Sequence, residues 1–152
     1  MEIIKAEPDM KDIIREITHS TIDAVYPLYY PHGAVEFFKA LHSEESIVSD
    51  LEKGNTYLLY EGDKPAATIT VRDDHIMRLF VLREYQRRGF GSRLLDFAED
   101  MIAGRFSEAV IDASFPAKTL YLRRGYSEME FNTVKTENGD YLCYDVMSKK
   151  LK

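Results

Sequence analysis

Residues 79–93 constrain the fold of this chain more than any other segment. The apolar run Leu79-Phe80-Val81-Leu82 predicts a buried strand, and residues 91–103 have the apolar spacing of one helical face. Two glycines, Gly89 and Gly91, lie between the strand and the helix. Glycine adopts positive φ readily and lets a ligand approach the backbone closely. The segment therefore predicts a strand, a tight turn and a helix in direct succession.

The start of this helix is suited to an anion. The N–H groups of a first helical turn have no partner within the helix, and the helix dipole favours negative charge there. Arg87, Arg88 and Arg93 add positive charge nearby. The turn thus predicts a phosphate or pyrophosphate site, although a plain strand-to-helix turn with solvated arginines would have the same residues. Two nucleotide motifs do not fit, because Leu94 occupies the third glycine position of the dinucleotide fingerprint and no Gly-Lys-Ser/Thr is present.

The rest of the chain predicts one α/β domain of the α+β type, spanning residues 1–152, with a mixed sheet and helices on both faces. No linker, repeat or low-complexity tract divides it. The expected order is β-α-α-β-β-β-α-β-α-β-β. The expected elements are a strand at 1–6, a helix capped by Asp9, a bent helix end and loop within 18–32, a helical region at about 33–52, strands at 56–60, 66–71 and 75–82, a helix at 91–103, a strand at 109–113, a helix from Pro116 that ends at Gly125, and two strands within 126–152 joined at 137–140.

Composition excludes several classes of partner. A net charge of -6 argues against binding to a nucleic-acid backbone, which needs a basic face. The charge fits a cationic substrate, but solubility alone explains it equally well. No apolar run approaches the roughly 20 residues that cross a membrane, and the first residues lack the pattern of a signal peptide. One cysteine builds no disulfide framework, and the four histidines show no zinc-site spacing. We expect a cytoplasmic protein that binds no metal.

Two motifs carry a resemblance to a known family. Gln86-Arg87-Arg88-Gly89-Phe90-Gly91 follows a strand and closely resembles the Gln/Arg-x-x-Gly-x-Gly/Ala cofactor motif of the GNAT superfamily of N-acetyltransferases. Residues 114–126 resemble a second motif of that family, Asn-x-x-Ala-x-x-x-Tyr-x-x-x-Gly-Phe. Ala117, Tyr121 and Gly125 match in register, whereas serine at 114 and tyrosine at 126 replace the family's residues. The expected element order also matches the family over essentially the whole chain.

The resemblance implies direct transfer of an acetyl group from acetyl-CoA to a primary amine of a small molecule or peptide. It also implies that backbone N–H groups from about Phe80 to Leu82, near the end of the strand expected at 75–82, bind the pantetheine and the thioester carbonyl, and that the turn binds the pyrophosphate. The serine at 114 puts in doubt the cofactor contact that the family's asparagine often makes. The implied cofactor-binding residues are Phe80, Val81, Leu82, Gln86, Arg87, Arg88, Gly89, Phe90, Gly91, Ser92, Ser114, Ala117 and Tyr121.

The catalytic assignments rest on the same resemblance. Tyr121 matches the tyrosine that many members place beside the thioester sulfur, where it serves as the acid; otherwise it is a packing residue. His75 begins the strand that carries the thioester contacts, and histidine titrates near neutral pH, so it is a candidate base. Asp112 is a second candidate, and a chain of waters without a single base is a third. Cys143 has no partner base nearby in the sequence and is expected to be a small buried residue.

Other aspects of function stay open at this level. Tyr26, Tyr29, Tyr30 and His32 lie where the family builds the rim of the acceptor site. The amine acceptor itself cannot be identified from the sequence, and the protein is expected to be a monomer or a homodimer. A catalytically silent acyl-CoA-binding module, used as a sensor or to bind a partner, is the alternative function.

Overall fold

The computed structural model describes residues 1–151 and contains one seven-stranded mixed sheet. Its strand order is β1-β2-β3-β4-β5-β7-β6. Neighbouring strands are antiparallel except for β4 and β5, which are parallel. The strands are β1 (Glu2–Lys5), β2 (Thr56–Glu61), β3 (Lys64–Arg72), β4 (His75–Val81), β5 (Glu108–Ala113), β6 (Ser127–Lys135) and β7 (Tyr141–Lys150).

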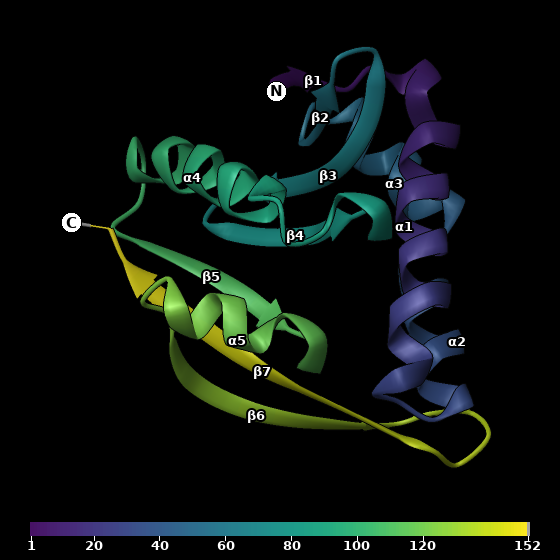
Figure 1. The fold of residues 1–152 in the computed structure, drawn as a ribbon. Helices are drawn as coiled ribbons and strands as arrows, with labels where there is room; N and C mark the ends of the chain where they lie inside the picture. Colours follow the sequence, from purple (N-terminus) through teal and green to yellow (C-terminus); the bar gives the residue numbers. More distant parts are fainter. Residues whose placement is uncertain (152) are drawn as a thin grey trace.

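Helices cover both faces of the sheet. They are α1 (Lys11–Val25), α2 (His32–Leu41), α3 (Glu44–Glu52), α4 (Phe90–Ala103) and α5 (Phe115–Arg123), with short 3-10 helices at Pro8–Met10, Tyr26–Leu28 and Arg83–Tyr85. Side chains alternate between the two faces of a strand, so each face has its own core. Leu94 and Leu95 of α4 pack with Ile76 and other residues on one face. Ile14 of α1 packs with Phe80 and others on the opposite face, and Figure 1 shows β3 and β4 between these two helices.

The fold class predicted from the sequence is confirmed, with corrections to the first half of the chain. The single helical region expected at 33–52 is two helices, because Ser43 accepts a hydrogen bond from the Ser46 N–H at 3.2 Å and caps a new helix. The order therefore begins β-α-α-α-β. Asp9 does not cap the first helix; it lies in the 3-10 helix Pro8–Met10, and α1 begins at Lys11.

The two parallel strands separate along their length. Their paired residues, His75 with Val110 and Ile76 with Ile111, are at the start of β4, and the strands then diverge (Figure 1). A bulge in β4 accompanies the divergence. Thr70 of β3 faces Met77 and Thr68 faces Phe80, so two residues of β4 lie opposite the single residue between them. A bulge bends and twists its strand, which turns the end of β4 away from β5.

The tip of the β6–β7 hairpin packs on the start of α2, next to which it lies in Figure 1. The Gly33 N–H donates to the Asp140 carboxylate at 2.8 Å, so a carboxylate lies at the positive end of the helix dipole. A Cβ on Gly33 would overlap the side chains of Asn138 and Thr136. Only glycine therefore allows this close approach, and it brings α2 over the last hairpin.

Candidate active site

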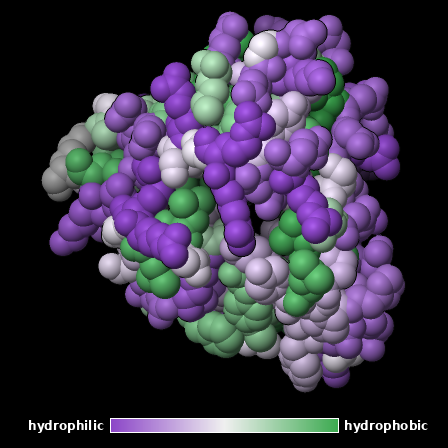
Figure 2. Space-filling model, viewed as in Figure 1, coloured by the Kyte–Doolittle hydropathy of each residue, from purple (hydrophilic) through white to green (hydrophobic). Residues whose placement is uncertain are grey.

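A cleft of about 830 Å³ lies where β4 and β5 diverge. Its walls come from β4, β5, the turn before α4, the start of α5, the end of α1, α2 and the last hairpin. The space-filling view of the face in Figure 1 is hollowed near its centre, and both hydrophilic and hydrophobic residues border the hollow (Figure 2). Segments from both halves of the chain therefore share one cavity.

The first turn of α4 presents free backbone N–H groups to the cleft. Gly89, the residue before the helix, has φ 86, and no side chain caps the helix start. Gly89, Phe90, Gly91 and Ser92 all line the cleft, and these are the positions whose N–H groups have no partner within a helix. With the dipole of a 14-residue helix behind them, these groups form a site for an anion.

Gly91 leaves room at this turn. A Cβ on Gly91 would lie 3.5 Å from Leu120 Cδ2 of α5 and 3.8 Å from Val81 Cγ2 of β4, which is contact distance. It would therefore fit the protein itself but would occupy the space between β4 and α5. A ligand with a phosphate at the helix start and an extended chain between the strands would fill this space.

The polar side chains of the turn differ in whether they reach the cleft and in what they bind. Arg87, with φ 61, lines the cleft. Gln86 also lines it, but its Nε2 donates to the Val81 carbonyl at 2.9 Å. Arg88 does not line the cleft: its Nη2 donates to the Glu61 carboxylate at 2.9 and 3.1 Å. Three arginines were expected near the anion, Arg87, Arg88 and Arg93. Arg87 lines the cleft, whereas Arg88 and Arg93 do not.

The backbone of β4 directs an N–H group into the cleft just after the bulge. The Leu82 N–H donates to the Ala66 carbonyl of β3 at 3.0 Å, so it is not available to a ligand, and Leu82 does not line the cleft. Successive peptide groups of a regular strand point to opposite sides. The N–H group of Val81 therefore points away from β3, toward the gap next to β5. Phe80 lines the cleft through its side chain.

Tyr121 lies in the wall formed by α5. Its side chain is 3% exposed and lines the cleft, with its ring 5.8 Å from that of Tyr126. Within residues 1–151 no group takes a hydrogen bond from its hydroxyl. Burial, and then the neighbouring Tyr26 and Tyr126, raise the pKa of Tyr121 well above its usual value. The phenol is therefore protonated at neutral pH and has a donor to offer inside the cleft.

Two tyrosines from the first half of the chain hold the junction of β5 and α5. The Tyr26 hydroxyl donates to Ser114 Oγ at 3.4 Å, and burial raises the pKa of Tyr26 to about 12. The Tyr30 hydroxyl accepts the Phe115 N–H at 2.7 Å and so caps α5. Ser114 and Ala117 both line the cleft. Tyr26, expected at the rim of the site, is thus part of its inner wall.

The two candidate bases face each other at the closed end of the gap. His75 Nε2 lies 3.5 Å from Asp112 Oδ1, too long for a strong hydrogen bond. Asp112 lines the cleft and its side chain is half exposed, whereas His75 does not line it. The Asp112 side chain raises the pKa of His75, although burial opposes this. Because Asp112 lies at the cleft and His75 behind it, Asp112 is the better placed of the two to reach a ligand.

A buried charge cluster beside the cleft was not predicted from the sequence. Arg78 Nη1 donates to Asp50 Oδ2 at 2.6 Å, and Arg72 Nη2 donates to Asp50 Oδ1 at 2.7 Å. Arg78 also donates to His42 Nδ1 at 3.2 Å and to Ser46 Oγ at 2.8 Å. An arginine inside the apolar strand Ile76-Met77-Arg78-Leu79-Phe80 was the signal that could have revealed it.

The charges of this cluster are fixed by their surroundings. The Asp50 carboxylate is fully buried, and burial alone would raise its pKa, but the hydrogen bonds from Arg72 and Arg78 lower it. Burial, and then the charge of Arg78, lower the pKa of His42 to about 3. The ring of His42 is therefore neutral at physiological pH, as its acceptance of the Arg78 hydrogen bond requires.

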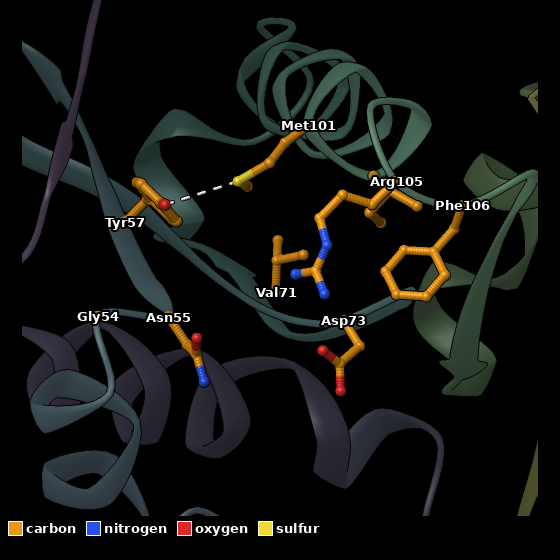
Figure 3. A pocket seen from close by; sticks show the side chains of 9 residues that line it. Gly54, Asn55, Tyr57, Val71, Asp73, Met101, Arg105 and Phe106 are labelled. Carbon is orange, nitrogen blue, oxygen red and sulfur yellow. Dashed lines mark hydrogen bonds between the residues drawn. The ribbon is translucent and has the colours of Figure 1, made fainter.

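A second, smaller pocket lies away from the cleft, near the end of α4 (Figure 3). Its volume is about 150 Å³, and it shares no lining residue with the cleft. Arg105 and Asp73 line it, and the Tyr57 hydroxyl lies 3.6 Å from Met101 Sδ at its edge. Across residues 1–151 we find neither a group of side chains able to hold a metal ion nor a helix long and apolar enough to cross a membrane. Cys143 is only partly buried.

The chain belongs to the GNAT superfamily, because the family model of the acetyltransferase (GNAT) domain matches residues 25–144. A GCN5-related N-acetyltransferase from Rhodopseudomonas palustris has the same fold, with a TM-score of 0.89, 24% identity, and coverage of 98% of this chain and 94% of that one.

Two further solved structures share the fold at lower identity. PaiA N-acetyltransferase from Thermoplasma acidophilum, solved in complex with coenzyme A, has a TM-score of 0.74, 16% identity and 98% coverage of both chains. The ribosomal-protein-S18-alanine N-acetyltransferase from Escherichia coli has a TM-score of 0.72, 19% identity, and coverage of 99% of this chain and 94% of that one. A search of curated proteins found no significant match.

Proposed function

We propose that this protein transfers an acetyl group from acetyl-CoA to a primary amine of a small molecule or peptide. The observation that carries the proposal is the combination of a GNAT domain with a cleft whose one end is an uncapped helix start. A coenzyme A complex of the Thermoplasma protein with the same fold supports the choice of cofactor. Acetyl-CoA would supply the acetyl group as an activated thioester.

The residues of the cleft fit this cofactor. The N–H groups of Gly89 to Ser92 and the guanidinium of Arg87 would hold its pyrophosphate. The pantetheine arm would run between β4 and β5, past the space that Gly91 leaves open. Fixing the cofactor at one end orients its reactive end and lowers the entropy cost of reaching the transition state.

The backbone of β4 would stabilise charge in the reaction. The N–H group of Val81 points toward the gap, where it would donate to the thioester carbonyl oxygen. Negative charge develops on that oxygen as the amine nitrogen attacks, so a donor held in place lowers the barrier. The same strand would thus bind the cofactor and assist the chemistry.

Tyr121 would assist the leaving group. The nitrogen–carbon bond forms, the carbon–sulfur bond breaks, and the sulfur leaves as a thiolate. A thiol has a pKa of about 8.5 in water, well below the raised pKa of Tyr121. Full proton transfer from the phenol to the thiolate is therefore uphill, and the main contribution of Tyr121 is a hydrogen bond to the sulfur as its charge develops.

Asp112 would accept the proton of the attacking ammonium, directly or through water. It is the one carboxylate among the cleft residues that the structure describes. His75 stands behind it, with Nε2 3.5 Å from Asp112 Oδ1, and would help to hold the carboxylate in position. Asp112→Asn should therefore lower turnover more than His75→Gln does.

Release of coenzyme A thiol in the presence of a panel of primary amines tests the proposal. Products should be identified by mass, with an increase of one acetyl group on the amine. Thiol release that depends on the amine supports the proposal. Tight binding of acetyl-CoA without transfer to any amine would instead favour a silent acyl-CoA-binding module.

A further inference from the structure

The end of the cleft farthest from the helix start of α4, here called the acceptor end, has an apolar wall. Phe37, Phe38 and Leu41 of α2, together with Met77, Leu142 and Tyr144, form this wall. The net charge of the whole chain is -6, yet Asp112 is the one carboxylate among the described residues that line the cleft. The charged side chains that line it away from the turn before α4 and from α5 are Arg72, Arg78 and Asp112, and His42 lines it as a neutral ring.

The charges at the acceptor end are unevenly distributed. Asp50 accepts hydrogen bonds from both arginines, so this group of three carries one excess positive charge. Asp112 lies outside this group, next to His75, whose Nε2 is 3.5 Å from Asp112 Oδ1. The part of the acceptor end beside Arg72 therefore favours an anionic group of a ligand over a cationic one.

Of the two arginines, Arg72 is available to a ligand. The Arg78 side chain is 4% exposed and donates to three different partners. The Arg72 side chain is 46% exposed, lines the cleft and donates to Asp50 through one nitrogen, Nη2. A guanidinium has five N–H donors in a planar fork, so several remain free. Asp50 holds the group in place, which reduces the entropy lost when it binds a ligand.

The spacing along the sheet sets the size of the ligand. Arg72 faces His75, whereas Phe80, next to the proposed thioester donor Val81, faces Thr68. Four residues along β3 correspond to about 13 Å. The Arg72 side chain bridges part of this span, and Met77, which lies between His75 and Phe80 on β4, lines the cleft. An acceptor that reaches from the thioester to the guanidinium must therefore be extended and apolar in its middle.

We infer that Arg72 binds the anionic end of the acceptor, and that the acceptor is an amine with a carboxylate at the far end of an apolar body. This inference rests on the proposed acetyl transfer and adds the class of substrate to it. A long ω-amino carboxylate and a short apolar peptide with a free C-terminus both have this chemistry. Arg72 is thereby a specificity-determining residue.

Matched pairs of substrates test this inference. A series of ω-amino carboxylates of increasing length is compared with the corresponding ω-amino amides, which keep the shape and lose the charge. Short apolar peptides are compared with their C-terminal amides in the same way. A charge-assisted hydrogen bond contributes about 1.5–3 kcal/mol, or about 10- to 100-fold in kcat/KM. The acids of best-fitting length should exceed their amides by this factor.

Variants identify the residue responsible. Arg72→Gln should remove the preference for the acid mainly through a higher KM, and Arg72→Lys should keep part of it. Arg105→Gln is the matched control, because Arg105 lines the separate pocket of Figure 3 and should leave the preference unchanged. Thermal melting of each variant establishes that it is folded. Asp50 retains its bond to Arg78 when Arg72 is replaced.

Equal kcat/KM values for acids and amides would overturn the inference, as would an undiminished preference in folded Arg72→Gln. Where none of these amines is acetylated, calorimetric titration of the coenzyme A-loaded protein with each acid and amide gives the same comparison. Tighter binding of the acid that is lost in Arg72→Gln supports the inference, and equal binding overturns it. The proposed function fails on different results, namely no binding of acetyl-CoA or no transfer to any primary amine.

Discussion

Asp50 Oδ2 lies 2.6 Å from Arg78 Nη1 in a pair whose side chains are 0% and 4% exposed. The pair joins α3 to the bulge of β4, where Arg78 has the positive φ of 52. A residue other than glycine in this conformation carries strain, which the surrounding contacts must offset. The ion pair therefore holds the bend that separates β4 from β5, and with it the shape of the cleft.

Asp50→Asn should destabilise the fold. It leaves the buried Arg78 without a counter-charge, and breaking a buried pair in this way typically costs about 3–5 kcal/mol. The free energy of unfolding in urea measures the effect. Asp23→Asn is the control, since Asp23 is 57% exposed and pairs with Lys39 at 3.0 Å; it should cost less than about 1 kcal/mol. Equal stability of wild type and Asp50→Asn would contradict this account of the bulge.

Stability should fall as the pH is lowered below that at which free histidine titrates. In the folded state the pKa of His42 is about 3, whereas it is about 6.5 in an unfolded chain. Between these values the unfolded state binds a proton that the folded state does not, so stability decreases as pH falls from about 6.5 toward about 3. The charged groups around His42 are Arg78, His19 and Asp50, and protonation of Asp50 adds a further loss at the acid end of this range.

Urea unfolding at a series of pH values measures this dependence. His42→Gln should flatten the slope between about pH 6 and 4.5, where the unfolded-state titration of His42 dominates. His32→Gln, at an exposed position at the start of α2, should leave the slope unchanged. The same slope in wild type and His42→Gln would show that the ring is not held neutral by the fold.

Gly33→Ala should loosen the contact between α2 and the last hairpin. The added methyl group would overlap the side chains of Asn138 and Thr136, and forced overpacking typically costs about 1–3 kcal/mol. The φ of Gly33 is not in the left-handed region, so the cost is steric. Gly104→Ala is the control, because its Cβ would meet the nearest atom at 3.4 Å. A Gly33→Ala protein as stable as Gly104→Ala would rule out this packing.

The parts of this fold that depend on local sequence were predictable, and those that depend on distant contacts were not. The helix expected at 91–103 is Phe90–Ala103, since a glycine turn and an apolar stripe determine it locally. The break at Ser43 was missed because apolar residues continue on both sides of it, and a serine cap is a weak signal in the sequence. The bulge at Arg78 depends on Asp50, which is 28 residues away in the chain.

The same distinction applies to the candidate site. The motif predicted that Gly89 to Ser92 would face an anion, and these residues do line the cleft. It did not reveal that Arg88 would turn to Glu61 or that Leu82 would use its N–H within the sheet, because both depend on partners from other strands. The charge at the acceptor end comes from three separate elements and was not visible in any motif.

Tyr121→Phe should slow acetyl transfer while cofactor affinity stays within a few-fold. Phenylalanine keeps the ring and its packing and removes the hydroxyl alone. A hydrogen bond to the developing thiolate contributes about 1.5–3 kcal/mol, so we expect the rate to fall about 10- to 100-fold. The measurement is kcat with a saturating amine. Tyr126→Phe is a useful comparison, because its hydroxyl donates to Glu99 at 3.0 Å instead of facing the cleft. A wild-type rate in Tyr121→Phe would show that this residue only packs.

The most direct test of the central claim is calorimetric titration of acetyl-CoA into the wild-type protein and into Gly91→Val. The valine side chain would fill the space between β4 and α5 at the start of α4, where the cofactor would pass. Gly91→Ala is a milder second variant, since a single Cβ there makes ordinary contacts, and Gly104→Val is a control far from the turn. We predict binding of acetyl-CoA to wild type and Gly104→Val, weaker binding to Gly91→Ala, and the weakest to a folded Gly91→Val. Absence of binding to the wild type, or unchanged affinity in folded Gly91→Val, would contradict the assignment of this cleft to acetyl-CoA.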